Sequence, residues 1–190
     1  MPIPFSDVEE YDELGSAAFL KLERSADDAC CLGALFVVSA RGEPLEFGYN
    51  RVGVPQPYLW RQADLRHYTE RRLASSLLSV CSQQPRLLVC LGHEVSTRLF
   101  GQDLQLELPV VRVGEGHPVR RRMDPDTGEV LEEEESPPHV EWQPAIPDAG
   151  SVEWRLFEHL SAHGLLLEPF ERATAGLQEV YGSKACLSRP

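Results

Sequence analysis

The sequence lacks the features that mark several large classes of protein. Only Lys21 and Lys184 are lysines among its 18 basic residues, and 30 acidic residues bring the net charge to −12. A protein that grips a phosphate backbone over a large area normally presents a basic surface. The charge balance therefore weighs against extensive nucleic-acid binding, although it leaves room for a local basic groove.

Long apolar runs are also missing. No stretch approaches the roughly 18 apolar residues that a membrane span needs, and residues 1–15 are acidic, without the apolar core of a signal peptide. The 5 cysteines form an odd set without a Cys-x-x-Cys pair, and most of them lie in apolar runs. We therefore expect a cytoplasmic protein without a disulfide framework.

The motifs of common catalytic sites do not occur. There is no Gly-x-Ser-x-Gly elbow and no His-Glu-x-x-His pair, and residues 114–117 lack the lysine of a phosphate-binding loop. Cys90 and His93 would be a thiol–imidazole pair, but a cysteine inside an apolar strand is more often inert core. The sequence thus contains no complete active site.

Apolar periodicity and turn residues predict an α/β core over residues 17–116. Three strands joined by short turns indicate an antiparallel meander, which is followed by helices and strands in alternation. With right-handed crossovers, the order β-β-β-α-β-α-β predicts a five-stranded mixed sheet of the ribonuclease H-like type. The expected strands are 18–22, 31–38, 45–50, 86–91 and 108–113, and the expected helices are 61–82 and 93–100.

The remaining segments are expected to be appended to this core. Residues 1–16 predict an acidic arm, and 183–190 a frayed tail. Residues 117–149 predict a charged hairpin, in which arginines oppose glutamates, followed by a proline-rich linker. A disordered charged insert is the alternative for the hairpin. Residues 150–182 predict two helices that pack on the core, with an N-cap serine on the first and a proline in the first turn of the second.

Acids and a histidine near strand ends are the candidates for a metal or acid–base site. A simpler interpretation is available for the main ones: Glu46 alternates to the solvent side of its strand, and Glu94 suits the start of a helix. We therefore predict no catalytic residue and no cofactor. The alternative is Mg²⁺ or Mn²⁺ at Glu46, His93 and Glu94, with catalysis by Glu46, Asp64, Glu94 and Glu168.

Aromatic and arginine side chains outside the expected core are the candidates for a partner-binding surface. Aromatics beside proline-rich segments are typical of protein contacts, and arginines crowd the helix 61–82. The alternatives are packing against the C-terminal helices and a solvated, salt-bridged helix face. The predicted partner-binding residues are Tyr58, Trp60, Arg61, Arg66, Arg71, Arg72, Trp142 and Trp154.

Two short stretches resemble an uncharacterised bacterial family. They are Gly42–Phe47 (GEPLEF) and Leu167–Arg172 (LEPFER). This resemblance implies no function. The excess of arginine over lysine agrees with it, because such a composition is typical of a bacterial genome rich in G and C.

Residues 55–114 resemble endonuclease V, a ribonuclease H-fold nuclease for deaminated bases. The resemblance lies in the Pro-Tyr and arginine stretch at 57–61, in the strand at 87–93 and in the strand at 108–114. It implies phosphodiester cleavage by carboxylates that converge on two metal ions.

The residues that this chemistry would need are replaced. Cys90 stands where the family has an acid at the end of a strand, and Gln62 stands where it has a glutamate, with Asp64 the nearest acid. The first strand carries Lys21 and Glu23 in place of a central aspartate. Cysteine is a poor ligand for Mg²⁺, which prefers oxygen.

From these observations we expect a non-catalytic accessory subunit of a bacterial multi-protein system, in a hetero-complex with a protein encoded nearby. The alternative is a divergent ribonuclease H-like, metal-dependent nuclease or a nucleic-acid-binding protein. A small-molecule sensor that uses the C-terminal rim of the sheet is a third class, which nothing in the sequence favours.

Overall fold

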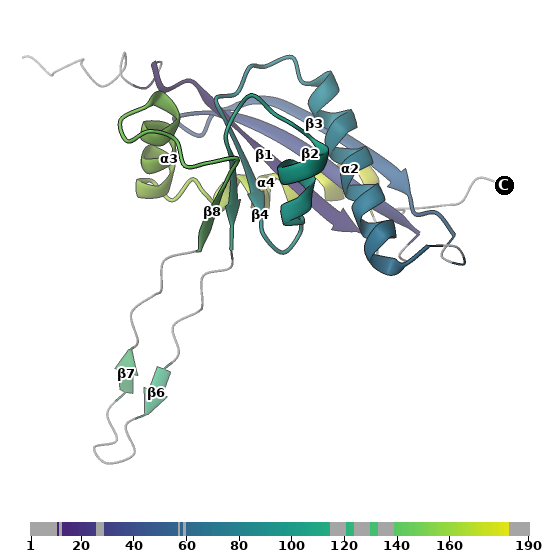
Figure 1. Ribbon diagram of the computed structural model, residues 1–190. Coiled ribbons are helices and arrows are strands. Elements are labelled where there is room, and N and C mark those ends of the chain that lie inside the picture. Colours follow the sequence, from purple (N-terminus) through teal and green to yellow (C-terminus); the bar gives the residue numbers. More distant parts are fainter. Residues whose placement is uncertain are drawn as a thin grey trace, which may run out of the picture.

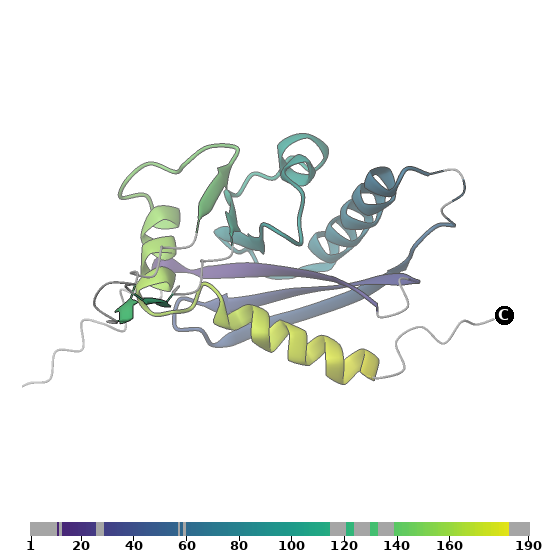
Figure 2. The same ribbon diagram turned by 90° about the horizontal axis from the view of Figure 1, so that it is seen from below.

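The structure is a computed structural model that describes residues 11, 13–25, 29–56, 58, 60–114, 121–123, 130–132 and 139–182. Within these residues, six strands form one mixed sheet in the order β3-β2-β1-β4-β5-β8. Helix α2 covers one face of this sheet, and helices α3 and α4 pack on the other (Figures 1 and 2). A buried apolar cluster lies on each face, which makes three layers.

The meander predicted for the first three strands is present. β1 (Ser16–Arg24), β2 (Cys30–Ser39) and β3 (Pro44–Gly53) pair antiparallel in sequence order. β1 and β2 are apolar on both faces because both faces are covered. In β1, for example, Phe19 packs under α4 and Leu20 packs under α2. The central strand of the sheet is therefore fixed by burial on both sides.

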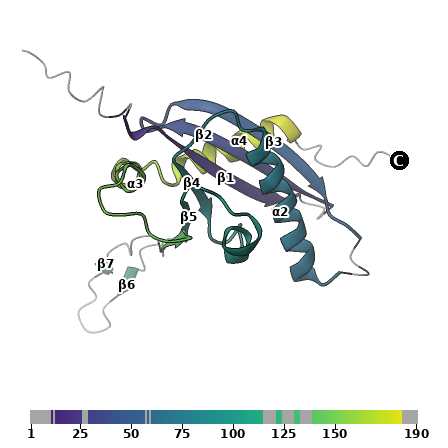
Figure 3. The same ribbon diagram turned by 45° about the horizontal axis from the view of Figure 1, so that its top comes forward.

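Two parallel strands follow the meander. α2 (Gln62–Val80) buries leucines at helical spacing against the sheet and connects β3 to β4 (Leu87–Leu91). β4 pairs in parallel with β1, and β5 (Val110–Val113) pairs in parallel with β4 (Figure 3). The helix expected at 93–100 is wrong in its bounds, because that segment begins as a loop and ends in the short π-helix η2 (Leu99–Asp103).

The expectation of five strands is wrong. β8 (Val140–Gln143) adds a sixth strand, antiparallel to β5, inside the segment that the sequence assigned to a linker. Its side chains alternate, and Val140 and Trp142 pack against the core. β6 (Arg121–Met123) and β7 (Val130–Glu132) pair antiparallel as a separate two-stranded sheet.

Two helices complete the face opposite α2. Ser151 caps α3 (Val152–Ala162) by accepting a hydrogen bond from the Trp154 amide at 3.2 Å. α4 (Glu168–Tyr181) begins with a proline in its first turn and lies along β1 and β2. Phe170 of α4 meets Phe19 of β1 edge to face, with ring centroids 5.3 Å apart.

Several other expectations concern the chain ends, the cysteines and the membrane. Most of the predicted acidic arm and the tail at 183–190 lie outside the described residues. Cys30 is disulfide-bonded, which weakens the argument from cysteine usage for a reducing compartment, whereas Cys31, Cys81 and Cys90 are free. In the described part of the chain, no helix combines the length and apolar character needed to cross a membrane.

Candidate functional site

The loop that follows β4, residues 92–97, is held in place by side chains from three other elements. It leaves the sheet at the C-terminal rim of the parallel strands, where α/β proteins usually bind ligands. Arg66 of α2, Arg112 of β5 and Gln143 of β8 all donate to its main-chain carbonyls. The carbonyl acceptors are His93 and Glu94 for Arg66, Gly92 and Val95 for Arg112, and Thr97 for Gln143, at 2.8–3.3 Å.

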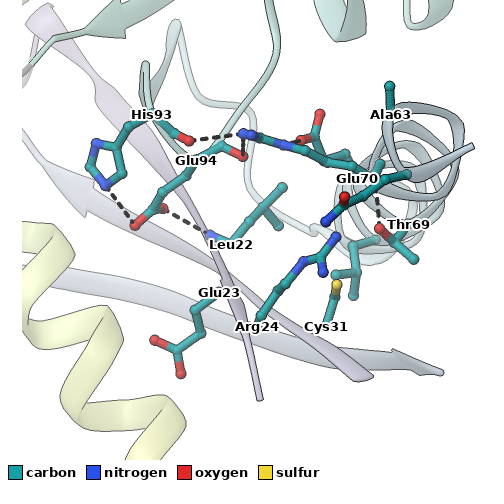
Figure 4. Close-up of a pocket in the computed structure, with 12 residues that line it drawn as sticks. Leu22, Glu23, Arg24, Cys31, Ala63, Thr69, Glu70, His93 and Glu94 are labelled. Carbon is teal, nitrogen blue, oxygen red and sulfur yellow. Dashed lines mark hydrogen bonds and ion pairs between the residues drawn. The ribbon is translucent and has the colours of Figure 1, made fainter. Parts of the chain in front are cut away.

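The Glu94 side chain of this loop points back to the central strand. Its carboxylate accepts a hydrogen bond from the Lys21 ammonium and another from the Leu22 amide, the latter at 3.1 Å. His93 Nε2 lies 3.6 Å from the same carboxylate (Figure 4). Only 7% of the Glu94 side chain and 14% of the Lys21 side chain are exposed. Lys21 and Glu94 therefore form a buried, hydrogen-bonded ion pair.

Glu70 of α2 is the second buried acid near this loop. Its two oxygens accept from Arg66 Nε, one turn earlier in the helix, and from the Ser96 amide at 3.2 Å. Arg112, a buried arginine within an apolar strand, is paired across to Glu141 of β8. Glu70 with Arg66 and Arg112 with Glu141 are thus joined in pairs, as buried charges usually are.

Burial also sets the chemistry of two other groups near the rim. It raises the pKa of the Glu23 carboxyl, with Lys21 acting in the opposite direction and Glu94 adding to the rise. Burial raises the pKa of the Cys90 thiol to about 12, against the lowering effect of Arg112. A thiol with that pKa stays protonated near neutral pH, so Cys90 is no nucleophile for a pair with His93.

A hollow of about 610 Å³ lies between the ends of β1 and β2 and the first half of α2 (Figure 4). We call it the Leu22 hollow. Leu22, Thr69, Cys31 and Leu73 contribute to its lining, and the Arg66–Glu70 pair and Glu94 add polar groups. Gln62 also lines it. Lys21, through its bond to Glu94, and Gln62, in the lining of the hollow, thus lie at the same end of the sheet, where Leu20 pairs with Cys90.

The alternative metal site is not assembled. Glu46 accepts hydrogen bonds from the Ser82 hydroxyl and amide and from the Gln83 amide, just beyond the C-terminus of α2. Glu94 contacts the other end of that helix, whose 19 residues span ~28 Å at ~1.5 Å per residue. In the described residues, no three histidine, cysteine or acidic side chains are placed to hold a metal ion.

The four acids of the alternative catalytic set are likewise dispersed. Asp64 is exposed on the first turn of α2. Glu168 begins α4 on the opposite face of the sheet and is bound by Arg172, which also donates to the Gly42 carbonyl. Gly42 lies in the turn between β2 and β3, at the far end of β2 from the Leu22 hollow. Glu94 is thus separated from both Glu46 and Glu168.

The predicted partner-binding residues fall into two groups. Tyr58 is 84% exposed and Trp60 is 41% exposed. The ring centroids of Trp60 and Tyr68 lie 5.4 Å apart, and the Arg72 guanidinium donates a hydrogen bond to the Tyr68 hydroxyl. Arg61, Arg71 and Arg72 are exposed at or along α2, whereas Arg66 is engaged by the loop. By contrast, the rings of Trp142 and Trp154 stack with centroids 5.8 Å apart. Phe157 meets Trp142 edge to face at 5.0 Å and lies tilted to Trp154 at 6.0 Å, so both tryptophans pack against other side chains of the protein.

Sequence reasoning missed Glu70, Arg112 and Gln143 as parts of this region. Two of them left a visible signal. Arg66 and Glu70 stand four residues apart on a helix, a spacing that permits an ion pair, and Arg112 interrupts the apolar strand Val110–Val113. The Gln143 contact left no such signal, because its partner is 46 residues away in the chain.

No family model matches this chain, and no curated protein matches it in sequence. Solved structures of endonuclease V do resemble it. The enzyme from Streptomyces avermitilis gives a TM-score of 0.52 at 15% identity, over 97% of this chain and 96% of that one. The enzyme from Bacillus subtilis gives a TM-score of 0.46 at 12% identity, over 87% and 79%. The resemblance to endonuclease V is therefore confirmed for the fold by the first of these structures, and this chain is a mixed α/β protein with an endonuclease V-like fold.

Proposed function

We propose that this protein is a non-catalytic binding subunit built on an endonuclease V-like fold. One observation carries the proposal: the Lys21 ammonium is bonded to the Glu94 carboxylate at the rim of the sheet. Two-metal cleavage needs several carboxylates around cations about 4 Å apart. Here the central strand carries the Lys21 ammonium in place of a carboxylate. That ammonium is bonded to Glu94, the buried carboxylate that a metal ion would otherwise bind.

The energetics of the rim support this proposal. A divalent cation at Glu94 would have to displace the Lys21 ammonium, which is 14% exposed and would lose its partner. An uncompensated buried charge is costly, and the ammonium would also repel the metal ion. Glu70 and Glu141 offer no substitute, because Arg66 and Arg112 already neutralise them.

The exposed side of α2 supports binding to a partner protein with an acidic surface. We define the α2 basic surface as Arg61, Arg71 and Arg72 with the aromatic side chains of Tyr58 and Trp60. These residues are exposed on a protein whose net charge is −12. Arginine, tryptophan and tyrosine are the residues that most often dominate protein interfaces. Charge complementarity would guide an acidic partner to this surface.

The test is to purify this protein together with the products of the neighbouring genes. We expect a complex of fixed stoichiometry by size-exclusion chromatography with light scattering. The change Arg71→Glu with Arg72→Glu should weaken it at least tenfold, and Arg51→Glu, an exposed arginine on β3, should leave it unchanged. Mn²⁺-dependent cleavage of an oligonucleotide containing a deaminated base, lost in Glu94→Gln, would overturn the proposal in favour of the nuclease.

A second candidate function is binding of single-stranded nucleic acid without cleavage. Trp60 and Tyr68 lie against each other beside Arg61 and Arg72, an arrangement that can stack bases and neutralise phosphates. Fluorescence anisotropy with a labelled oligonucleotide distinguishes the two candidates. Nucleic-acid binding predicts an affinity that falls steeply between 50 and 200 mM salt and that Trp60→Ala weakens. A subunit that binds only protein partners should not bind the oligonucleotide at these salt concentrations.

A further inference from the structure

β3 is an edge strand of the sheet, and it is as long as the strand with which it pairs. It has 10 residues, as β2 does, and it stands at one end of the strand order (Figure 3). Within the described residues, no strand pairs with its outer side. An exposed edge presents unpaired main-chain N–H and C=O groups, which are a template for another strand. Neither of the functions proposed above uses this edge.

The main-chain groups that face outward follow from the pairing of β3 with β2. The Val54 amide donates to the Ala29 carbonyl at 2.9 Å, so residue 54 faces the β2 side. Along an antiparallel strand, successive residues direct their main-chain groups alternately to one neighbour and to the other side. The register between the two strands is regular from Glu46 onward, because its one irregularity lies before that residue. The residues whose N–H and C=O groups point away from the sheet are therefore Phe47, Tyr49 and Arg51.

The outer half of β3 lacks the devices that protect natural edge strands. Such strands commonly carry a proline, a bulge or several charges. A proline and a bulge occur only where β3 begins, at Pro44 and before Glu46. From Phe47 to Gly53 the strand has no proline, and Arg51 is its one charged residue. This part of the edge is therefore open to pairing.

Tyr49 stands at the centre of the regular part of the strand, Glu46–Val52. Its side chain is 49% exposed, and its ring lies 5.9 Å, between centroids, from the rings of both Phe47 and Tyr181. A two-fold axis through Tyr49, perpendicular to the sheet, would place residue 49 opposite itself and Phe47 opposite Arg51 of a second copy. Every outward-facing residue of one copy then meets an outward-facing residue of the other. The exposed aromatic rings of the two copies also meet, on the same face of the joined sheet.

Charge permits this pairing although the protein is acidic. Two copies with a net charge of −12 each repel one another. β3 itself is neutral, because it contains one acid, Glu46, and one base, Arg51. With the axis at Tyr49, Glu46 comes opposite Val52 and Arg51 comes opposite Phe47, so no like charges face each other. The edge is thus complementary to itself.

We propose that β3 pairs antiparallel with β3 of a second copy of this chain, on a two-fold axis at Tyr49. Main-chain hydrogen bonds at residues 47, 49 and 51 hold the two edges together, and the two sheets become one continuous sheet. The interface is small, so the dissociation constant should be on the order of 10 µM.

Sedimentation velocity on the full chain, from about 1 to about 200 µM, tests the proposal. We expect a concentration-dependent shift from monomer to dimer. Tyr49→Pro removes the exposed ring and an outward N–H without breaking a bond to β2, and it should weaken the dimer at least tenfold. Ile146→Lys changes an exposed apolar side chain outside β3 and should leave the dimer unchanged.

Cysteine cross-linking tests the register. With copper–phenanthroline as oxidant, Tyr49→Cys should form a disulfide-linked dimer, because the axis places residue 49 opposite itself. Leu45→Cys lies on the same strand and replaces a side chain that is 45% exposed. It should not cross-link, since the axis sets the two copies of residue 45 roughly 27 Å apart at ~3.4 Å per residue. The wild type, with free Cys31, Cys81 and Cys90, gives the background.

Three results would overturn the proposal: a wild-type chain that stays monomeric over this range, a Tyr49→Pro chain that dimerises as tightly as the wild type, or cross-linking of Leu45→Cys as efficient as that of Tyr49→Cys. A monomeric wild type whose complex with the product of a neighbouring gene is lost in Tyr49→Pro would instead assign the edge to a partner's strand. Thermal melting separates lost pairing from lost folding, and the cross-linking comparison needs no proline variant. Self-association is measured on this chain alone, so its failure is distinct from failure of the hetero-complex.

Discussion

Lys21 of β1 and Glu94 of the loop after β4 are 73 residues apart in the chain and form a buried ion pair at the rim of the sheet. The parallel pairing of β1 with β4 brings them together, since Leu20, next to Lys21, lies opposite Cys90 at the end of β4. The pair ties the central strand to the loop that forms one wall of the Leu22 hollow. Changes to Lys21 therefore test both the stability of this rim and the absence of a metal site.

Lys21→Met should destabilise the protein by roughly 3–5 kcal/mol, because it leaves the buried Glu94 carboxylate without its cation. Urea denaturation at pH 7 measures the free energy of unfolding. The double change Lys21→Met with Glu94→Leu should recover much of the loss, since it removes both charges. Arg86→Met breaks a more exposed pair with Glu153 and should cost about 1 kcal/mol or less. Equal losses for Lys21→Met and Arg86→Met would contradict the buried pair.

Replacing the Lys21 ammonium by a carboxylate should create metal affinity that the wild type lacks. Mn²⁺ should leave the melting temperature of the wild type unchanged and should raise that of Lys21→Asp, because two carboxylates would then face each other. At a Mn²⁺ concentration ten times the dissociation constant, the gain is about 1.4 kcal/mol. Lys21→Asn removes the ammonium without adding an acid and serves as the control. A Mn²⁺-induced shift in the wild type would instead support the nuclease.

Glu46 should make the stability of the protein depend on pH in the acid range. Hydrogen bonds from the Ser82 hydroxyl and then the Ser82 amide lower the pKa of this carboxyl from its ordinary value of 4.5. Its contribution is therefore complete above pH 4.5 and is lost as the pH falls through the lowered pKa. Urea denaturation should show Glu46→Gln less stable than the wild type at pH 7, with a smaller difference at pH 3. In a Ser82→Ala background the difference at pH 7 should shrink. A difference that stays constant with pH would show that Glu46 acts through packing alone.

The parts of the fold that the sequence predicted are those set by local pattern. The apolar run of β2 and the leucine spacing of α2 stand out without tertiary information, because each element is covered on a known side. β8 escaped prediction because Pro144 follows it directly and other prolines surround it, although Val140 and Trp142 alternate with polar residues. Short edge strands carry too few residues for periodicity to outweigh such breakers.

The sequence placed the candidate site at the rim near Glu46, Cys90, Gly92 and His93, and the missing acids were evident from Cys90, Gln62 and Lys21. Glu46 lies elsewhere, bonded to Ser82 and Gln83. What fills their place was not evident, because the Lys21–Glu94 contact depends on the pairing of strands distant in sequence. Glu46 was grouped with Glu94 because Glu46 lies on a strand and Glu94 follows one. Glu46 contacts residues just beyond the C-terminus of α2, whereas Glu94 contacts its first half, so the length of the helix separates the two acids.

The close approach of α4 to β3 gives a test of the packing on the opposite face. A Cβ atom on Gly176 would lie 2.5 Å from Phe47 Cζ, well inside contact distance. The Phe47 ring cannot move away easily, because it packs against the rings of Phe36 and Tyr49. In an open helix, Gly→Ala gains about 1 kcal/mol from helix propensity. Here the overpacking cost of about 1–3 kcal/mol opposes that gain.

We therefore expect Gly176→Ala to leave the protein no more stable, and up to about 2 kcal/mol less stable, in urea denaturation. Gly53→Ala on β3 is the matched control, because its Cβ would meet no atom within 4 Å. Phe47→Leu should reverse the sign of the effect, since a smaller side chain leaves room for the added methyl group. In that background, Gly176→Ala should stabilise. If Gly176→Ala raises the stability of the wild type by the full propensity gain, α4 does not pack on β3 at the spacing described.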